Sequence, residues 1–311
     1  MIELNHVSKM YGNVVGVNDL TLRLPMGAYG LIGPNGSGKT TLINLLIGHF
    51  RPTIGSLRVL DTSPSSDRQL LRRIGLCPAS DVLYPNVSAL EWVQYQIRLH
   101  GIPRRDCRRL AETALEIVDM TDAMRRPMGT YSLGMRQRTK IAQAIAHQPD
   151  LLILDEPYNG LDPVGRNDMT RMLRDWTQSG RGLIFASHVL QEIESVTPSF
   201  LLIHGGRLLA SGTAAEIESI LADTPQEVRL VGKDVAKLIH RLADVDWVES
   251  LQLNHVKHEL KVSLREPIEF YRQISTWIRD DNLVIEQLRT PDGNLEAVFE
   301  SLLRRHRGDV T

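Results

Sequence analysis

Long apolar runs are missing from this sequence. No uninterrupted apolar stretch approaches the roughly 20 residues that a membrane-spanning helix needs. The segment Met1–His6 has no basic region followed by an apolar core, so we expect no signal peptide. If the protein works at a membrane, we therefore expect it to do so by docking to a protein that spans it.

Cysteine and an excess of charge of one sign are also missing. The two cysteines, Cys77 and Cys107, are too few for a disulfide framework, and we expect both to be reduced thiols of a cytosolic protein. The 36 Lys and Arg residues balance 37 Asp and Glu residues to a formal net charge of −1. No basic field favours nucleic acid, and we expect no nucleic-acid partner.

The first part of the chain, residues 1–222, alternates short apolar runs with helical stretches. The runs at 30–32, 151–154, 182–186 and 200–203 are typical of buried parallel strands. Strands separated by helices predict an α/β domain built on a parallel sheet. From about residue 86 to 148 the pattern is mostly helical, which predicts a helical insertion in this domain.

The second part, residues 223–311, has a different pattern and contains no chemical motif. Segments 227–231, 259–264 and 283–288 are strand candidates. Segments 235–242, 268–279 and 294–305 are helix candidates. We expect a small α+β domain, with a split βαβ arrangement as one possibility, and stabilisation as its default role beside regulation or dimerisation.

A glycine-rich loop between an apolar strand and an apolar helix is the strongest chemical signal. Its spacing is that of a phosphate-binding loop, and it consists of Gly33, Pro34, Asn35, Gly36, Ser37, Gly38, Lys39 and Thr40, followed by Thr41. Glycines let the backbone N–H groups approach phosphate oxygens, and the following helix adds its positive N-terminal end. Lys39 would reach the β- and γ-phosphates, and the Thr40 hydroxyl would bind Mg²⁺.

Two acids, Asp155 and Glu156, follow the apolar run at 151–154. The carboxyl end of a parallel strand is where such sheets bind ligands. We expect Asp155 to hold Mg²⁺ through water and Glu156 to polarise the attacking water. Alone, the pair would more often cap a helix or face solvent; the phosphate loop upstream favours the catalytic interpretation.

Together with four further segments, these motifs make the chain resemble the ATPases of ABC transporters over roughly residues 2–217. Tyr131–Arg138 occupies the place of the family signature, and Asn159–Pro163, which includes Asp162, matches its D-loop. Ser187 and His188 match its switch histidine, and Tyr11 sits where an aromatic ring stacks on adenine. The resemblance implies an ABC-type P-loop NTPase core with a helical subdomain, binding ATP and Mg²⁺.

Further expectations come from the same resemblance. Ser132 and the backbone N–H of Gly134 would cover the γ-phosphate bound by a second copy in a head-to-tail dimer. His188 would bond the γ-phosphate and the partner's D-loop, with catalysis shared between Glu156 and His188. ATP hydrolysis would drive an integral membrane permease, and the chain would lie at the cytoplasmic face of the membrane through that partner.

Two departures from the family pattern matter. Ala79 falls where the family carries a Gln that touches Mg²⁺ and water; either Ser80 or Asp81 substitutes, or the contact is absent and hydrolysis is slow. Leu133 and Met135 replace a Gly and a Gln of the signature, a form that resembles the ATPases of ABC-2 type exporters. The segment 294–302, with its Leu-Glu-x-x-Phe pattern, points to the same subgroup and favours export over import.

The alternative from another class is an ATP-sensing scaffold or regulatory ABC protein with little hydrolysis, which Ala79 raises. Steady-state ATPase measurements would separate it from a transport motor. No long heptad pattern of a chromosome-associated ATPase is visible, and a single phosphate loop argues against a two-cassette translation factor.

Overall fold

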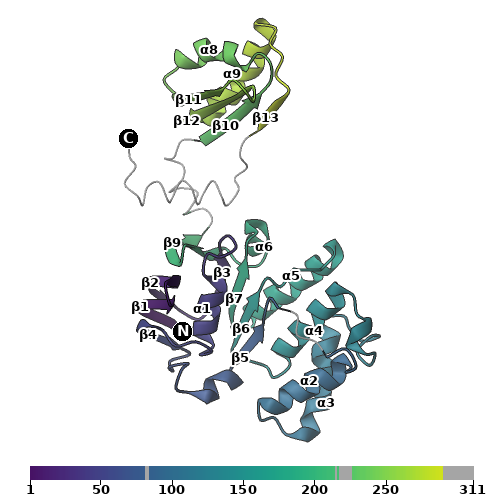
Figure 1. The fold of residues 1–311 in the computed structure, drawn as a ribbon. Helices are drawn as coiled ribbons and strands as arrows, with labels where there is room; N and C mark the ends of the chain where they lie inside the picture. Colours follow the sequence, from purple (N-terminus) through teal and green to yellow (C-terminus); the bar gives the residue numbers. More distant parts are fainter. Residues whose placement is uncertain (81–83, 214–215, 217–225, 290–311) are drawn as a thin grey trace. The chain divides into compact units, whose positions relative to one another are not determined.

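A computed structural model describes residues 1–80, 84–213, 216 and 226–289. The chain divides into two compact units, Met1–Ala214 and Ala215–Thr311 (Figure 1). The expected boundary between residues 222 and 223, the expected helix at 294–305 and the tail pattern at 294–302 lie outside the described residues. Among the described helices, none has both the length and the apolar character required to cross a membrane.

The first unit is built on two sheets. A three-stranded antiparallel sheet has the order β2-β1-β4, with β1 at Ile2–Tyr11, β2 at Val14–Leu24 and β4 at Ile54–Val59. A six-stranded sheet has the order β5-β6-β7-β3-β8-β9. Its strands are β3 (Ala28–Ile32), β5 (Ile74–Cys77), β6 (Leu151–Asp155), β7 (Gly182–Ser187), β8 (Ser199–His204) and β9 (Arg207–Thr213).

The register of the six-stranded sheet places several loops at one edge. Strands β5, β6, β7, β3 and β8 are parallel, and only β9 runs antiparallel to its neighbour. Cys77 pairs with Leu154, Asp155 with Ala186, and Ile32 with Ser187. The loops after β3, β5, β6 and β7 therefore leave the sheet side by side. The predicted parallel α/β sheet is confirmed, and this edge is where such sheets bind ligands.

Helices connect these strands, and three of them form the expected insertion. The helices of the first unit are α1 (Lys39–Leu46), α2 (Ala89–Leu99), α3 (Arg104–Ile117), α4 (Leu133–Ile145), α5 (Pro163–Gln178) and α6 (Leu190–Glu194), with 3-10 helices η1 (Arg68–Arg72) and η2 (Met128–Thr130). Figure 1 shows α2, α3 and α4 grouped on the side of the six-stranded sheet away from β1, β2 and β4.

Local sequence explains where the inserted helices begin. Ser88 and Glu91 form a reciprocal capping box at the start of α2, which satisfies two backbone N–H groups that the helix leaves unpaired. The Ser132 side chain accepts a hydrogen bond from Met135 N at 3.3 Å and so caps α4.

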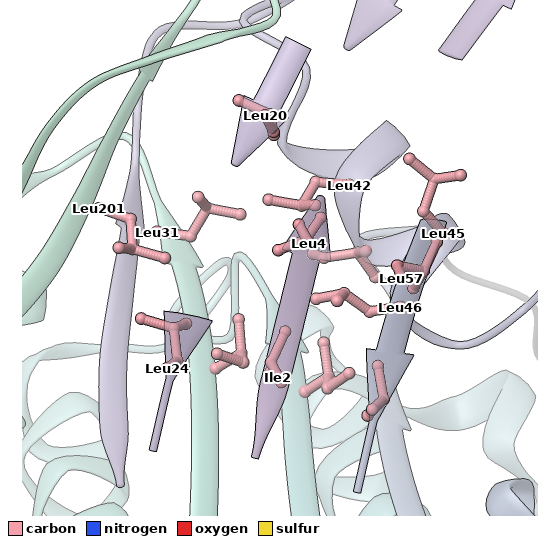
Figure 2. Packing of buried hydrophobic residues seen from close by; sticks show 14 of the residues in the cluster. Ile2, Leu4, Leu20, Leu24, Leu31, Leu42, Leu45, Leu46, Leu57 and Leu201 are labelled. Carbon is pink, nitrogen blue, oxygen red and sulfur yellow. The ribbon is translucent and has the colours of Figure 1, made fainter. Parts of the chain in front are cut away.

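An apolar core joins the antiparallel sheet, α1 and the six-stranded sheet. Figure 2 shows Leu4, Leu42 and Leu45 converging with Leu31 and Leu201 from the larger sheet. Each of these side chains is at most 4% exposed. Burying such a side chain contributes about 1.5–3 kcal/mol relative to leaving it exposed. This packing fixes α1 and, with it, the glycine-rich loop that enters the helix.

The second unit is a single sheet with helices on one face. The strands β10 (Gln226–Val231), β11 (Val248–Asn254), β12 (Glu259–Leu264) and β13 (Gln287–Arg289) lie in the order β11-β12-β10-β13, all antiparallel. The 3-10 helix η3 (Val235–Leu238) and α8 (Ile239–Ala243) follow β10, and α9 (Pro267–Asp280) follows β12. Phe270 and Trp277 of α9 pack on Val228, Leu230 and Val262 of the sheet. This is the split βαβ arrangement.

Two details of the second unit differ from the expectation. Strand β11 was missed because its alternation is interrupted, and Ser250 marks a register shift against β12. The third expected strand, at 283–288, forms only at residues 287–289. Residues 283–286 precede β13 as an irregular segment in which Leu283 is buried and Val284 N bonds to Asp234.

Candidate functional site

Two positions of the loop from Gly33 to Gly38 have backbone conformations that favour glycine. Gly36 and Gly38 have φ values of 79° and 108°, in the left-handed region that other residues rarely adopt. A Cβ added at Gly38 would lie 2.4 Å from the carbonyl oxygen of Gly16. Strand β2 thus comes so close to this loop that a side chain at position 38 would push it away. The glycines therefore serve the tight turn that the sequence predicted.

The loop is closed by its own backbone and by the β8–β9 turn. Ser37 N donates to Pro34 O at 3.1 Å, and Gly206 N donates to Ser37 O at 2.9 Å. The Ser37 hydroxyl is buried and has no hydrogen-bond partner in the described structure. A buried polar group without a partner is costly, so this hydroxyl is suited to bonding a ligand held by the loop.

The side chain of Lys39 folds back onto the loop from which it extends. Its ammonium donates to Gly33 O at 2.6 Å and to Pro34 O at 3.3 Å, and it lies 3.8 Å from the Glu156 carboxylate. The side chain is 7% exposed, and burial lowers its pKa, an effect that Glu156 and Asp155 oppose. A buried cation at the N-terminus of α1 is suited to an anion site of the kind predicted for phosphate.

Thr40 and Asp155 meet although 115 positions separate them. The Thr40 hydroxyl donates to Asp155 Oδ2 at 3.0 Å. Asp155 ends β6 and is 3% exposed, and burial raises the pKa of its carboxyl while the Thr40 hydrogen bond, Lys39 and Lys140 oppose that rise. A hydroxyl and a carboxylate in contact are oxygen ligands of the type that Mg²⁺ prefers, so these two residues fit the ion predicted here.

Glu156 is held in an unusual backbone conformation beside this pair. Its φ is 52°, and its N–H donates to Ala186 O at 2.9 Å. The carboxylate is 12% exposed and lies 2.9 Å from Nδ1 of His188, which follows β7 and is half exposed. Burial raises the pKa of Glu156, while His188 and Lys39 oppose this. The register of β6 and β7 therefore brings together the two residues predicted to be catalytic.

An aromatic surface lies beside the phosphate-type loop. The Tyr11 hydroxyl donates to the Thr41 hydroxyl at 3.4 Å, and its ring is 40% exposed. Phe50 packs edge-on against the Tyr11 ring with centroids 5.6 Å apart, and the Lys9 ammonium is 5.5 Å from both rings. Phe50 and Lys9 were missed because Phe50 follows α1 by four residues and nothing local links it to β1.

Ser132, Gly134 and Asp162 lie away from the glycine-rich loop. Ser132 caps α4, Asp162 Oδ1 accepts from Gly165 N at 2.9 Å and caps α5, and a Cβ on Gly134 would lie 3.0 Å from Gly160 O. Within the described part of the chain, no hydrogen bond or ion pair joins these residues to loop 33–38. Figure 1 shows α4 well separated from α1. One chain by itself does not bring the predicted set together.

The loop after β5 contains the predicted departure, Ala79, which is exposed. Its methyl group supplies no hydrogen bond. The Lys140 ammonium of α4 instead donates to Pro78 O at 3.1 Å, with Ala79 O and Ser80 O at 3.4 and 3.5 Å. The alternative candidate Asp81 lies outside the described residues. Lys140 was missed by sequence reasoning; it is the charged residue among the buried positions of α4.

Several known proteins are similar to this chain in sequence. Residues 17–159 match the family model described as ABC transporter. The bacitracin transport ATP-binding protein BcrA of Bacillus licheniformis is 37% identical over 212 residues, which cover 67% of this chain and 68% of that protein. The linearmycin resistance ATP-binding protein LnrL of Bacillus subtilis is 29% identical over 98% of this chain and 99% of its own length.

A solved structure of an ATP-binding subunit of an ABC transporter is also similar. It has a TM-score of 0.65 and 26% identity, covering 71% of this chain and 93% of that chain. The chain belongs to the ABC transporter family and is one of its ATP-binding, ATP-hydrolysing subunits. The expected α/β ABC-type core is confirmed.

Proposed function

We propose that two copies of this chain bind and hydrolyse ATP with Mg²⁺ at two shared sites and thereby drive export through a membrane-spanning partner. The observation that carries the proposal is the meeting, at one sheet edge, of the Lys39 loop, the Thr40–Asp155 contact and the Glu156–His188 pair. An anion site, an oxygen-ligand pair and a carboxylate beside an imidazole are the parts that phosphoryl transfer to water requires.

Binding of ATP is assigned to the first of these parts. The triphosphate would lie along loop 33–38 at the N-terminus of α1, with its oxygens bonded by backbone N–H groups and the Ser37 hydroxyl. Lys39 would exchange its two carbonyl contacts for phosphate oxygens. Thr41 would bond phosphate beside Thr40, and the exposed ring of Tyr11 would stack on adenine.

Mg²⁺ would be held by Thr40 directly and by Asp155 through water. The ion would neutralise charge on the phosphate oxygens. Asp155 is buried and close to Lys39 and Lys140, whose positive charges favour its ionised form before the ion arrives. The hydrogen bond from Thr40 keeps the two oxygen atoms adjacent.

Hydrolysis is assigned to Glu156 and His188. The carboxylate of Glu156 would accept a proton from the attacking water. It is suited to this role because it is buried, because burial raises its pKa, and because it lies at the sheet edge beside the Lys39 loop. His188 contacts the other side of this carboxylate and would orient it while its remaining ring nitrogen faces the γ-phosphate.

A second copy would complete each site. Ser132 and Gly134 lie at the N-terminus of α4, a helix end suited to an anion, but far from the loop of their own chain. A two-fold, head-to-tail dimer would place this helix end over the γ-phosphate bound by the other chain, with the D-loop around Asp162 at the interface. Hydrolysis would remove the shared phosphate and open the dimer.

The membrane partner is inferred from the relatives and from the surface near residues 79–101. BcrA is named for bacitracin transport and LnrL for linearmycin resistance. The Met135 form of the signature points in the same direction, towards export. Tyr84, Trp92 and Tyr95 form an aromatic cluster in which Tyr84 and Tyr95 are exposed, and we assign docking of an integral membrane permease to this surface. The chain would then lie at the cytoplasmic face of the membrane.

A nucleotide-sensing scaffold remains the second candidate because Ala79 supplies no contact to the hydrolysis site. It would bind ATP and close with little turnover. The discriminating experiment isolates the tagged full chain from solubilised membranes, identifies its partner and measures ATPase activity of the complex. Export predicts a multi-helix membrane protein and turnover that depends on Glu156. A complex without Glu156-dependent turnover would favour the scaffold, and a nucleic-acid or ribosomal partner would overturn both.

A further inference from the structure

Lys140 is a buried cation whose role in the activity described so far is limited to its charge near Asp155. It lies in the third turn of α4 and is 4% exposed. A lysine is rarely buried to this extent unless its charge is compensated, because desolvating an ammonium is costly. The reason for its presence must therefore lie in what surrounds the ammonium group.

Three consecutive carbonyl oxygens face this ammonium. Pro78 O, Ala79 O and Ser80 O lie 3.1, 3.4 and 3.5 Å from Nζ. A lysine ammonium has three N–H donors, so it can bond to more than one of these carbonyls at the same time. These are backbone groups of the loop that leaves β5, and no residue of this loop has to be long or polar for the contact to form.

This loop lies beside the hydrolysis site. Cys77 pairs with Leu154 in the parallel ladder, so the chain leaving β5 runs next to Asp155 at the end of β6. The positive charge of Lys140 is also close enough to lower the pKa of Asp155 against the rise caused by burial. The same ammonium thus contacts the loop at Ala79 and acts on the carboxylate assigned to Mg²⁺.

The helix that carries Lys140 begins at Ser132. Eight residues separate the two positions, which corresponds to about 12 Å of rise along one helix. One end of α4 is assigned to the ATP bound by the partner copy, and its third turn is bonded to the loop beside the chain's own ATP. A rigid helix with a contact at each place is a physical connection between the two sites.

We propose that Lys140 is a positioning residue for hydrolysis, holding loop 78–80 beside the reaction site by its carbonyl oxygens and tying that loop to the helix that begins at Ser132. The proposal rests on the function proposed above and deepens it. The ammonium places a loop whose own residue, Ala79, has no side-chain group with which to bond the site. Lys140 does not touch ATP and acts through the loop.

Three substitutions at Lys140 remove its contact with loop 78–80 to different extents. Lys140→Met removes the charge and all donors, Lys140→Gln keeps an amide donor without the charge, and Lys140→Arg keeps both charge and donors. The matched control is Arg138→Met on the same helix, which removes a cation bonded to Val118 O and Asp119 instead of the loop. All variants are made in the full-length chain. The melting temperature of each variant is measured first, to show that it folds, before hydrogen exchange or ATPase activity is measured.

The first measurement is hydrogen exchange of the peptide covering residues 74–80 in the protein without nucleotide. We expect exchange to rise about tenfold in Lys140→Met, less in Lys140→Gln and little in Lys140→Arg or Arg138→Met. The second is steady-state ATPase activity, where Lys140→Met should lower kcat at least tenfold and leave KM for ATP within threefold. Lys140→Arg should recover most of kcat.

Two results would overturn the proposal. If Lys140→Met keeps wild-type kcat, or if it raises exchange over the whole first unit while kcat and KM change together, Lys140 only stabilises the fold. If Lys140→Met does not fold, Lys140→Gln carries the same test. Failure of the wild-type chain and its complex to hydrolyse ATP would refute the proposed function instead, and the exchange result would still decide whether Lys140 holds the loop.

Discussion

Nδ1 of His188 lies 2.9 Å from Oε2 of Glu156, in a contact that joins the ends of two neighbouring parallel strands. The pairing of Asp155 with Ala186 puts the residues that follow β6 and β7 side by side. Glu156 adopts a positive φ there, which turns its carboxylate towards His188 and Lys39. The geometry of this pair is therefore built by the sheet register.

Replacing His188 should slow hydrolysis without preventing ATP binding. His188→Ala leaves Glu156 without its orienting contact, so we expect kcat to fall on the order of 100-fold, within the range of acid–base assistance, and KM for ATP to change little. Glu156 should also lose the His188 contact that opposes the rise in its pKa. Steady-state kinetics of the full chain would measure this. The exposed His49→Gln is the control, and a His188→Ala chain with wild-type kcat would contradict the role.

Restoring a glutamine at Ala79 should accelerate the reaction. Ala79→Gln adds an amide on a loop that Lys140 already holds, and we expect turnover to rise several-fold and the concentration of Mg²⁺ needed for half-maximal activity to fall. Ala79→Leu, of comparable length but without polar atoms, is the matched control. Unchanged turnover and unchanged Mg²⁺ dependence in Ala79→Gln would show that this position is not an impaired Mg²⁺ contact.

The ring of Tyr11 should contribute to ATP affinity and not to turnover. Stacking of a base on an aromatic side chain contributes roughly 1–3 kcal/mol, so Tyr11→Ala should raise Kd for ATP by about 5- to 150-fold. Tyr11→Phe keeps the ring and loses only the Thr41 hydrogen bond, and its Kd should stay within about threefold of wild type. Isothermal titration with ATP in the absence of turnover would decide. Equal losses in both variants would show that the hydroxyl, not the ring, matters.

A pair of stacked imidazoles should make the first unit sensitive to acid. The rings of His100 and His147 lie 3.7 Å apart, and burial together with His100 lowers the pKa of His147 to about 4. The unfolded chain has the ordinary value of 6.5, so it takes up a proton first as pH falls. Stability present above pH 6.5 is therefore lost as pH decreases towards 4, by about 2 kcal/mol at pH 5 from His147 alone.

Urea unfolding at pH 7.5 and pH 5 measures that loss. His147→Gln keeps a donor for the Ile74 carbonyl, 3.0 Å from the imidazole, but does not titrate. Its stability should decline less between the two pH values than that of the wild type. His49→Gln, which removes an exposed imidazole, should behave as wild type. An equal decline in all three chains would exclude the stacked pair as the cause.

Local sequence predicted the parts of this site that depend on backbone chemistry. The glycines of loop 33–38 and the strand ending in Asp155 both follow from residue type and spacing. The contacts between Thr40 and Asp155 and between Glu156 and His188 were implied by the order of motifs, since parallel strands end at one edge.

The contacts that escaped prediction join positions with no shared local pattern. Phe50 reaches Tyr11, and Lys140 reaches loop 78–80, only because strands and helices distant in the chain become neighbours. Lys140 also breaks the rule that buried helix faces are apolar, and its acceptors are backbone groups that no sequence pattern displays. The register shift at Ser250 hid strand β11 for a related reason, since a shift interrupts the period of two.

The central claim is that ATP joins two copies of this chain and that hydrolysis at Glu156 separates them. Glu156→Gln should bind ATP normally, turn over on the order of 100-fold more slowly and persist as a dimer. Glu116→Gln, an exposed acid of α3, should hydrolyse ATP and leave no persistent dimer. Adding Ser132→Arg to Glu156→Gln should keep ATP binding and abolish the dimer.

Sedimentation velocity of the Glu156→Gln chain with and without ATP tests this most directly. The account predicts a particle of twice the mass of one chain with saturating ATP, a single-chain particle without it, and no dimer when Ser132→Arg is added. A Glu156→Gln chain that binds ATP yet remains a single chain, or that hydrolyses ATP at the wild-type rate, would contradict the account.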